Sequence, residues 1–123
     1  MSTENNNTIL GTDAKEVVLS FIKALNEEHF EDAKAYANDK LKFIGVLGTR
    51  DGAEAYFSDM RKMRLKYDIK KIFVDLDNVC LWYDINMSGK IIPSCGWYHV
   101  EDGKISWFKV IFDPRPVLEG KNN

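Results

Sequence analysis

The sequence contains little cysteine, has a net charge close to zero and lacks any long apolar run. Its two cysteines, Cys80 and Cys95, are too few for a disulfide framework, so we expect reduced, half-buried thiols. The formal net charge is −2, with acidic and basic residues intermixed, which argues against a nucleic-acid partner. No apolar run approaches the roughly 20 residues of a membrane span, and no signal-peptide core is visible at the N-terminus. We therefore expect a cytoplasmic protein without membrane contact.

Residue sets that build metal, phosphate or thiol chemistry are also missing. The histidines, His29 and His99, stand alone without paired carboxylates, so we predict no metal site. The glycines of the segment 45–49 are not followed by the Lys-Ser/Thr of a phosphate-binding loop, and the cysteines lack CxxC spacing. The sequence predicts no cofactor.

The first half of the chain has helical periodicity. Residues 1–12 are polar and Asn-rich, and we predict a disordered tail. Asp13 and Glu16 indicate a helix start, and apolar residues at helical spacing continue to Leu25. A short second helix is predicted around residues 30–37, a strand over 41–47, and a third helix with apolar residues from 53 to 63.

The second half is rich in β-forming residues. Four strands are predicted over 69–77, 79–87, 91–101 and 104–113, with turn residues between them. Prolines stop the last strand, and residues 117–123 are predicted to form a loose tail. Helices followed by a strand meander indicate one α+β domain over residues 13–116, with about three helices covering one face of a curved, mostly antiparallel sheet.

Loop lengths predict which strand residues share a face. A two-residue Ser88-Gly89 loop pairs Met87 with Lys90, and therefore Trp82 with Cys95 and Cys80 with Trp97. A three-residue loop over 101–103 would pair Trp97 with Trp107, His99 with Ile105 and Gly96 with Phe108. The face toward the helices then carries Leu81, Tyr83, Ile85, Ser94, Gly96, Tyr98, Val100, Ser106, Phe108, Val110 and Phe112.

The other sheet face receives three tryptophans that the helices cannot cover. Trp82, Trp97 and Trp107, together with His99, would form a larger apolar patch than a monomer usually exposes. We predict a homodimer through this outer sheet face. The alternative is a flatter fold in which loops or the N-terminal tail cover the tryptophans.

Three segments carry a resemblance to a known family: AKEVVLSFIKALNEEHFEDAKAYANDKLKFIG, TRDGAEAYFSDM and EDGKISWFKVIFD. In their order and spacing over residues 13–116 they resemble the nuclear transport factor 2-like superfamily, and most closely its SnoaL-like and ketosteroid-isomerase-like small proteins. The resemblance implies a cystatin-like, cone-shaped roll with a pocket between the helices and the concave sheet. It also implies frequent dimers through the outer sheet face.

The catalytic residues of the ketosteroid-isomerase-like members are not matched. Their tyrosine falls on Phe21, their carboxylate base near Ile44 and their late-strand acid near Gly96. A phenyl ring cannot donate to an oxyanion and an isoleucine cannot accept a proton, so we predict no ketosteroid isomerase activity.

Two functions of different class stay open. The first is binding of a small hydrophobic or aromatic molecule in an apolar pocket without the isomerase residues. That pocket would be lined by Phe21, Ile44, Tyr56, Met60, Ser94, Gly96, Tyr98, Phe108 and Phe112. The second is a SnoaL-like lyase, isomerase or cyclase that uses Tyr98, Tyr83 or Asp39. A structural dimer with a filled cone is a third reading.

Overall fold

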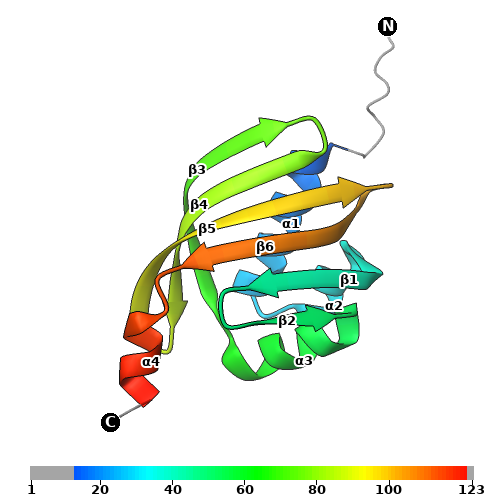
Figure 1. Ribbon diagram of the computed structural model, residues 1–123. Helices are drawn as coiled ribbons and strands as arrows, with labels where there is room; N and C mark the ends of the chain where they lie inside the picture. The colour runs from blue at the N-terminus through cyan, green and yellow to red at the C-terminus, as the bar shows by residue number, and fades with distance from the viewer. Residues whose placement is uncertain (1–12, 122–123) are drawn as a thin grey trace, which may run out of the picture.

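A computed structural model describes residues 13–121 of the chain (Figure 1). The tail predicted over residues 1–12 lies outside the described residues, as do residues 122 and 123. Three helices come early: α1 (Ala14–Asn26), α2 (Phe30–Ala35) and α3 (Ala53–Met63). The predicted start of α1 is confirmed, because the Asp13 side chain accepts a hydrogen bond from the Lys15 backbone N–H at 3.0 Å.

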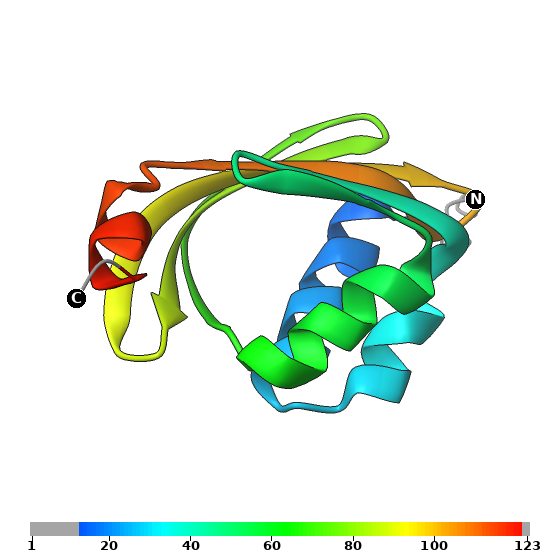
Figure 2. The same cartoon turned by 60° about the horizontal axis from the view of Figure 1, so that its bottom comes forward.

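Six strands form one sheet in the order β2-β1-β6-β5-β4-β3. Their bounds are β1 (Ala37–Gly45), β2 (Gly48–Asp51), β3 (Lys66–Asp75), β4 (Asn78–Met87), β5 (Lys90–Glu101) and β6 (Lys104–Phe112). All neighbouring strands are antiparallel except β1 and β6, which are parallel. Figure 2 shows the sheet arching over α1, α2 and α3, which confirms the predicted α+β class. The short strand β2 was not predicted.

The predicted register of β4 and β5 is confirmed, whereas that of β5 and β6 is wrong. Met87 pairs with Lys90, Cys80 with Trp97 and Trp82 with Cys95, as the two-residue loop requires. In the next hairpin Glu101 pairs with Lys104, so its loop has two residues, and both Asp102 and Gly103 have positive φ. This loop together with a one-residue shift farther along the two strands places Trp97 opposite Lys109 and Gly96 opposite Val110.

A bulge explains why most β6 side chains lie on the predicted sheet face although the predicted register is wrong. The pairing shifts by one residue between His99 and Val100, which leaves Ser106 as the extra residue of β6. Beyond this bulge, the side chains of β6 return to the predicted faces, and Phe108 and Val110 are buried. Before it the faces are exchanged. Ile105, predicted outward, pairs with Val100 and is fully buried.

The outer sheet face carries an aromatic patch, here defined as Phe73, Trp82, Trp97, His99, Trp107 and Ile111. Within residues 13–121 nothing covers its centre: Trp82 is 49% exposed, Trp97 44% and Ile111 58%. The Trp107 ring stacks on His99 and meets Trp97 edge to face at 5.0 Å between centroids. Asn78 accepts from the Trp97 indole N–H at 2.9 Å, which fixes that ring.

The C-terminal segment that was predicted to be loose is helical in the structure. Residues 115–121 form a fourth helix, α4 (Arg115–Lys121), which lies apart from the other three (Figure 2). Arg115 binds both carboxylate oxygens of Asp113, and the Lys90 ammonium donates to the Pro116 carbonyl at 2.7 Å. Pro116 at the second helical position is compatible with a helix because the first-turn N–H groups need no intrahelical partner.

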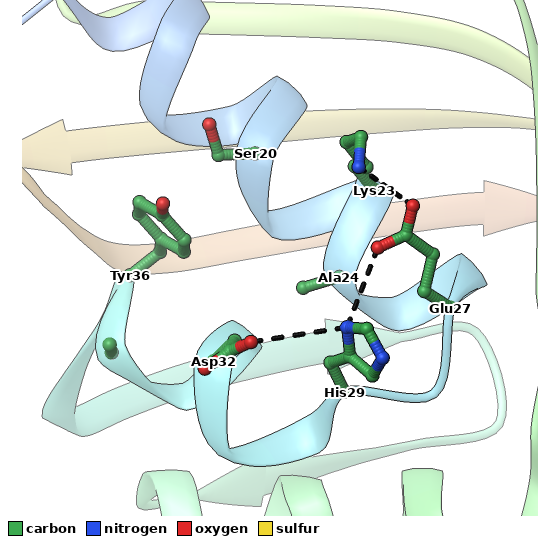
Figure 3. Close-up of a pocket in the computed structure, with 8 residues that line it drawn as sticks. Ser20, Lys23, Ala24, Glu27, His29, Asp32 and Tyr36 are labelled. Carbon is green, nitrogen blue, oxygen red and sulfur yellow. Dashed lines mark hydrogen bonds and ion pairs between the residues drawn. The ribbon is translucent and has the colours of Figure 1, made fainter.

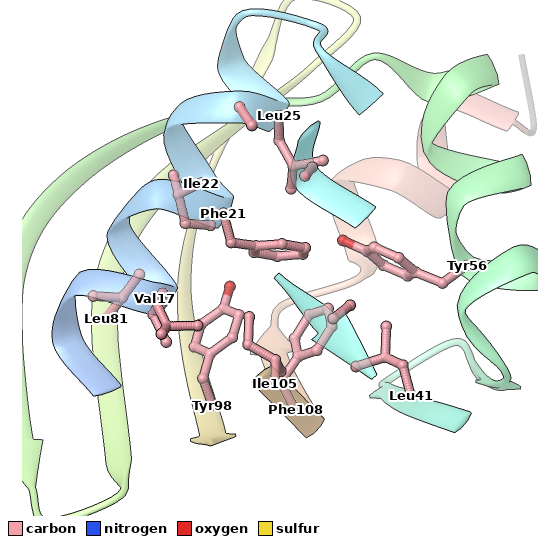
Figure 4. Close-up of a cluster of buried hydrophobic side chains, with 14 of the residues drawn as sticks. Val17, Phe21, Ile22, Leu25, Leu41, Tyr56, Leu81, Tyr98, Ile105 and Phe108 are labelled. Carbon is pink, nitrogen blue, oxygen red and sulfur yellow. The ribbon is translucent and has the colours of Figure 1, made fainter. Parts of the chain in front are cut away.

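The core lies between α1, α3 and the concave face of the sheet. Figure 4 shows Phe21 of α1 at its centre, with Tyr56, Tyr98 and Phe108 around it. Phe21, Leu25 and Leu41 are almost completely inaccessible to water. None of the helices in residues 13–121 is both long and apolar enough to cross a membrane.

Candidate functional site

A cavity of about 320 Å³ opens between α3, the β1–β2 hairpin, the concave sheet and α4. Its walls are mainly aliphatic, aromatic and methionine side chains. The residues that line it are Phe43, Gly45, Val46, Leu47, Gly48, Tyr56, Asp59, Met60, Met63, Leu65, Tyr67, Ile85, Met87, Phe108, Val110, Phe112 and Val117.

Four of the predicted pocket residues line this cavity: Tyr56, Met60, Phe108 and Phe112. Phe21 does not, because it is 0% exposed and its ring is enclosed by other aromatic rings in the core. Ile44 does not line the cavity because successive side chains of β1 point to opposite faces of the sheet. Phe43 pairs with inward-facing Phe108, whereas Ile44 pairs with Lys109 of the outer face.

Gly96 and its neighbours were also predicted to line the pocket, and the structure places them elsewhere. A Cβ on Gly96 would lie 2.3 Å from the Tyr83 hydroxyl oxygen and 2.7 Å from a Tyr98 ring carbon. Tyrosine atoms therefore fill the space that the missing side chain leaves. The Ser94 hydroxyl donates to the Ile92 carbonyl at 2.9 Å and is likewise buried outside the cavity.

None of the three catalytic candidates lines the cavity. The Tyr83 and Tyr98 hydroxyls share a buried hydrogen bond of 2.6 Å, and neither residue lines the cavity. Burial raises the pKa of both phenols well above the usual value. Asp39 lies exposed on β1 and is not among the cavity-lining residues.

Several cavity residues escaped the sequence analysis. Tyr67 is the second residue of β3 and lies two residues before the predicted strand, and Val117 belongs to the segment predicted to be loose. Phe43 could have been found from the strict alternation of β1, which places it opposite to Ile44. Asp59 lies one turn along α3 from Tyr56, a spacing that puts both on one helix face.

Two tyrosines and one ion-paired carboxylate supply polar side chains to the cavity wall. Burial raises the pKa of Tyr56 and Tyr67, so both phenols are protonated at neutral pH. Asp59 accepts a hydrogen bond from the Arg50 guanidinium at 2.7 Å. The arrangement can donate hydrogen bonds to a ligand within largely apolar walls.

A second hollow of about 290 Å³ lies between α1 and α2 (Figure 3). It is polar, and its charged side chains contact one another. Lys23 donates to Glu27 at 2.7 Å, and the His29 ring nitrogen Nδ1 lies 3.5 Å from Glu27 and 3.9 Å from Asp32. His29 is exposed at the start of α2, as predicted.

Metal-ligating and thiol groups do not gather in the described part of the chain. Between residues 13 and 121, no set of three His, Cys, Asp or Glu side chains could hold a metal ion. Cys80 and Cys95 are free and half-buried, as predicted. Burial raises the pKa of the Cys80 thiol, which disfavours the nucleophilic thiolate.

Comparison with known proteins agrees with this geometry. The sequence model of the SnoaL-like domain matches residues 18–108. An NTF2-like protein of unknown function from Cytophaga hutchinsonii is 44% identical, with a TM-score of 0.85 over 96% of this chain and 99% of that chain. None of the curated proteins compared with the chain matches it.

More distant structures share the fold alone. An LEH-like epoxide hydrolase from M. tuberculosis is 24% identical, with a TM-score of 0.72 over 89% of each chain. A candidate SnoaL-like polyketide cyclase from Shewanella denitrificans is 15% identical, with a TM-score of 0.72 over 89% of this chain and 96% of that one. From the match over residues 18–108 and the Cytophaga relative, the chain belongs to the SnoaL-like family of the NTF2-like superfamily.

Proposed function

We propose that the protein binds a small hydrophobic or aromatic molecule in the cavity between α3, the β1–β2 hairpin and the concave sheet. The observation that carries this proposal is the cavity itself, which has about 320 Å³ of space and predominantly apolar walls. Pockets of this size and character are typical ligand sites. A molecule of two or three fused rings would fit such a volume.

Exposed apolar residues at the cavity support entry of such a ligand. Val46 and Leu47, at the turn between β1 and β2, are 43% and 55% exposed, and Met63 at the end of α3 is 49% exposed. Methionine side chains adapt to ligands of different shape because they are unbranched and flexible. These residues are suited to admit an apolar molecule from water.

The geometry gives no support to ketosteroid isomerase chemistry. The three positions that the resemblance assigns to that chemistry carry Phe21, Ile44 and Gly96, and none of them lines the cavity. We expect no turnover of an unconjugated enone steroid.

A pair of tryptophan substitutions on neighbouring residues of β6 tests the binding proposal. Val110 lines the cavity, whereas Ile111 lies next to it on the outer face and is 58% exposed. Val110→Trp should fill the cavity and abolish fluorescence enhancement of the neutral dye N-phenyl-1-naphthylamine. Ile111→Trp adds the same indole outside the cavity and should leave the enhancement unchanged.

The outer face could also attract the dye, and a third variant distinguishes the two sites. Trp97→Glu places a charge on the aromatic patch without touching the cavity. If dye binding persists in Val110→Trp but is lost in Trp97→Glu, the dye binds to the outer face and the proposal fails. Near-ultraviolet circular dichroism confirms that each variant is folded.

A second candidate function is favoured by Asp59. Its carboxylate lies on the same cavity wall as the Tyr56 and Tyr67 phenols, which is a composition suited to proton transfer beside a carbonyl group. In that case a SnoaL-like isomerase or cyclase would use Asp59 rather than Asp39. The protein would then accelerate exchange of the α-hydrogens of 2-tetralone in D₂O, and Asp59→Asn would remove the acceleration. Exchange at the buffer rate with the wild-type protein counts against this candidate.

A further inference from the structure

Aromatic rings form a large part of the cavity wall. Phe43, Tyr56 and Phe108 line the cavity and pack on one another, with ring centroids 5.1–5.4 Å apart. Tyr56 reaches from α3 toward Phe108 of β6 (Figure 4), and Tyr67 and Phe112 add two further rings to the wall. The face of an aromatic ring carries partial negative charge, so a wall of this kind attracts cations as well as apolar groups.

Asp59 adds a full negative charge to this wall. It follows Tyr56 by three residues along α3, a spacing that places the two side chains on one face of the helix. Among the described residues that line the cavity, Asp59 is the one charged side chain. Its side chain is 33% exposed, so the carboxylate is partly shielded from water. The described wall therefore carries negative charge without a balancing cation.

Arg50 occupies one of the two carboxylate oxygens of Asp59. The Arg50 Nε–H donates to Oδ2 of Asp59 at 2.7 Å, and its Nη1 donates to the Thr49 carbonyl at 3.3 Å. Within residues 13–121, no protein group donates a hydrogen bond to Oδ1 of Asp59. The Arg50 side chain is 52% exposed and does not line the cavity, so water and salt screen its charge. One carboxylate oxygen thus stays available to a ligand.

The charge of the wall favours one class of ligand. A carboxylate or phosphate would meet Asp59 in apolar surroundings without a cation on the wall to balance it. A metal ion would need several oxygen ligands, and the aliphatic and aromatic side chains of the wall do not supply them. An organic ammonium group with apolar substituents can contact the carboxylate and the aromatic rings together.

We infer that the cavity selects an aromatic organic cation, whose ammonium group lies between Asp59 and the rings of Phe43, Tyr56 and Phe108. The apolar part of the ligand fills the remaining space. This inference rests on the proposed binding function and adds the charge of the ligand and the residue that recognises it. Asp59 acts here in binding and specificity, and no reaction step is assigned to it.

A matched pair of probes differs in charge and keeps the same shape. (2-Naphthylmethyl)trimethylammonium carries a permanent positive charge, and 2-(2,2-dimethylpropyl)naphthalene has carbon in place of the nitrogen. Equilibrium dialysis of the wild-type protein should show the cation binding about threefold to tenfold more tightly, the effect of a partly exposed ion pair with ring contacts. Val110→Trp, which fills the cavity, should abolish binding of both probes.

Two substitutions break the same Asp59–Arg50 ion pair and should move this preference in opposite directions. Asp59→Asn removes the recognising charge and should remove the preference for the cation. Arg50→Gln removes the competing positive charge and should increase the preference. An ion pair with a structural role alone would give the same change in both variants. Asp51→Asn is the control, because Asp51 is exposed, follows Arg50 on β2 and points to the opposite sheet face.

Three results would count against the inference. If the neutral probe binds the wild-type protein as tightly as the cation, or if the preference moves in the same direction in Asp59→Asn and Arg50→Gln, the inference is overturned while the binding function stands. Cation binding that persists in Val110→Trp would place the cation on the outer tryptophans and overturn it as well. If the wild-type protein binds neither probe and does not bind N-phenyl-1-naphthylamine, the proposed function also fails.

Discussion

Gly96 shows how a single missing Cβ can be required by packing alone. The backbone of β5 at this position is in contact with the Tyr83 hydroxyl and the Tyr98 ring, which occupy the place of a side chain. Gly96 was predicted to line the pocket. In the structure the glycine permits a close approach of two aromatic side chains that belong to the core.

Gly96→Ala should therefore destabilise the protein. The added methyl group would overlap the Tyr83 oxygen at 2.3 Å, and the surrounding core is too closely packed to yield freely. We expect a loss of about 1–3 kcal/mol in the free energy of unfolding, the usual cost of overpacking a core. Urea denaturation followed by tryptophan fluorescence measures this loss.

The control is the same substitution in a Tyr83→Phe background, which removes the overlapping oxygen. The two changes should be coupled, so that the double variant is more stable than the sum of the single effects predicts. Strict additivity, or a Gly96→Ala variant as stable as the wild type, would contradict the packing explanation.

At the level of elements, local patterns located most helices and strands. Helical spacing gave α1 and α3, and turn residues gave the four meander strands, because each signal lies within the element it defines. The bulge at Ser106 could not be predicted from local patterns. It depends on which of two loop lengths the β5–β6 hairpin adopts, and both are compatible with Glu101-Asp102-Gly103. β2 is four residues long and fully exposed, so it has no apolar alternation to detect.

The cavity residues were predictable only where they follow from the periodicity of a strand or a helix. Phe108 and Phe112 follow from the period of β6, and Tyr56 and Met60 from that of α3. The contribution of α4 was missed because one proline precedes the helix, a second is its second residue, and its last residues are polar. Its position depends on tertiary contacts, of which the Lys90–Pro116 hydrogen bond is one.

The start of α4 has a pH-dependent contact. Arg115 hydrogen bonds hold the pKa of the Asp113 carboxyl at about 2, below its ordinary value of 3.8. Because the folded pKa is the lower one, this contact contributes stability above about pH 4 and loses it as the pH falls through about 2. Arg115→Gln should move the NMR titration midpoint of the Asp113 carboxyl toward 3.8.

Arg64→Gln is a suitable control, because Arg64, directly after the end of α3, pairs with Glu28 rather than with Asp113. That variant should leave the Asp113 midpoint unchanged. A midpoint near 3.8 in the wild-type protein would show that the Asp113–Arg115 contact does not persist in solution.

At the scale of the whole molecule, the two faces of the sheet have different environments. The concave face packs on three helices, and the outer face keeps its aromatic patch in contact with water within residues 13–121. Two of its tryptophans are held by neighbours: Asn78 accepts a hydrogen bond from Trp97, and His99 stacks on Trp107. Ordered, exposed tryptophans are typical anchors of protein interfaces.

We expect a second copy of the chain to cover this patch through a two-fold interface. Residues of either charge, Lys109 and Asp84, flank the patch on the same sheet face, so this face can pack against a copy of itself. Burial of apolar area contributes roughly 25 cal/mol per Å² before the costs of association are subtracted. Sedimentation equilibrium should show a dimer at micromolar concentration.

Trp82→Glu combined with Trp97→Glu should give a folded monomer, because two like charges would meet their symmetry copies across an apolar interface. Leu76→Glu is the matched control. Leu76 is 86% exposed at the β3–β4 turn and lies off the patch, so the same charge there should leave the dimer intact. A wild-type protein that stays monomeric at high micromolar concentration would rule out the dimer. Dissociation in both variants would mean that charge, rather than burial of the tryptophans, controls association.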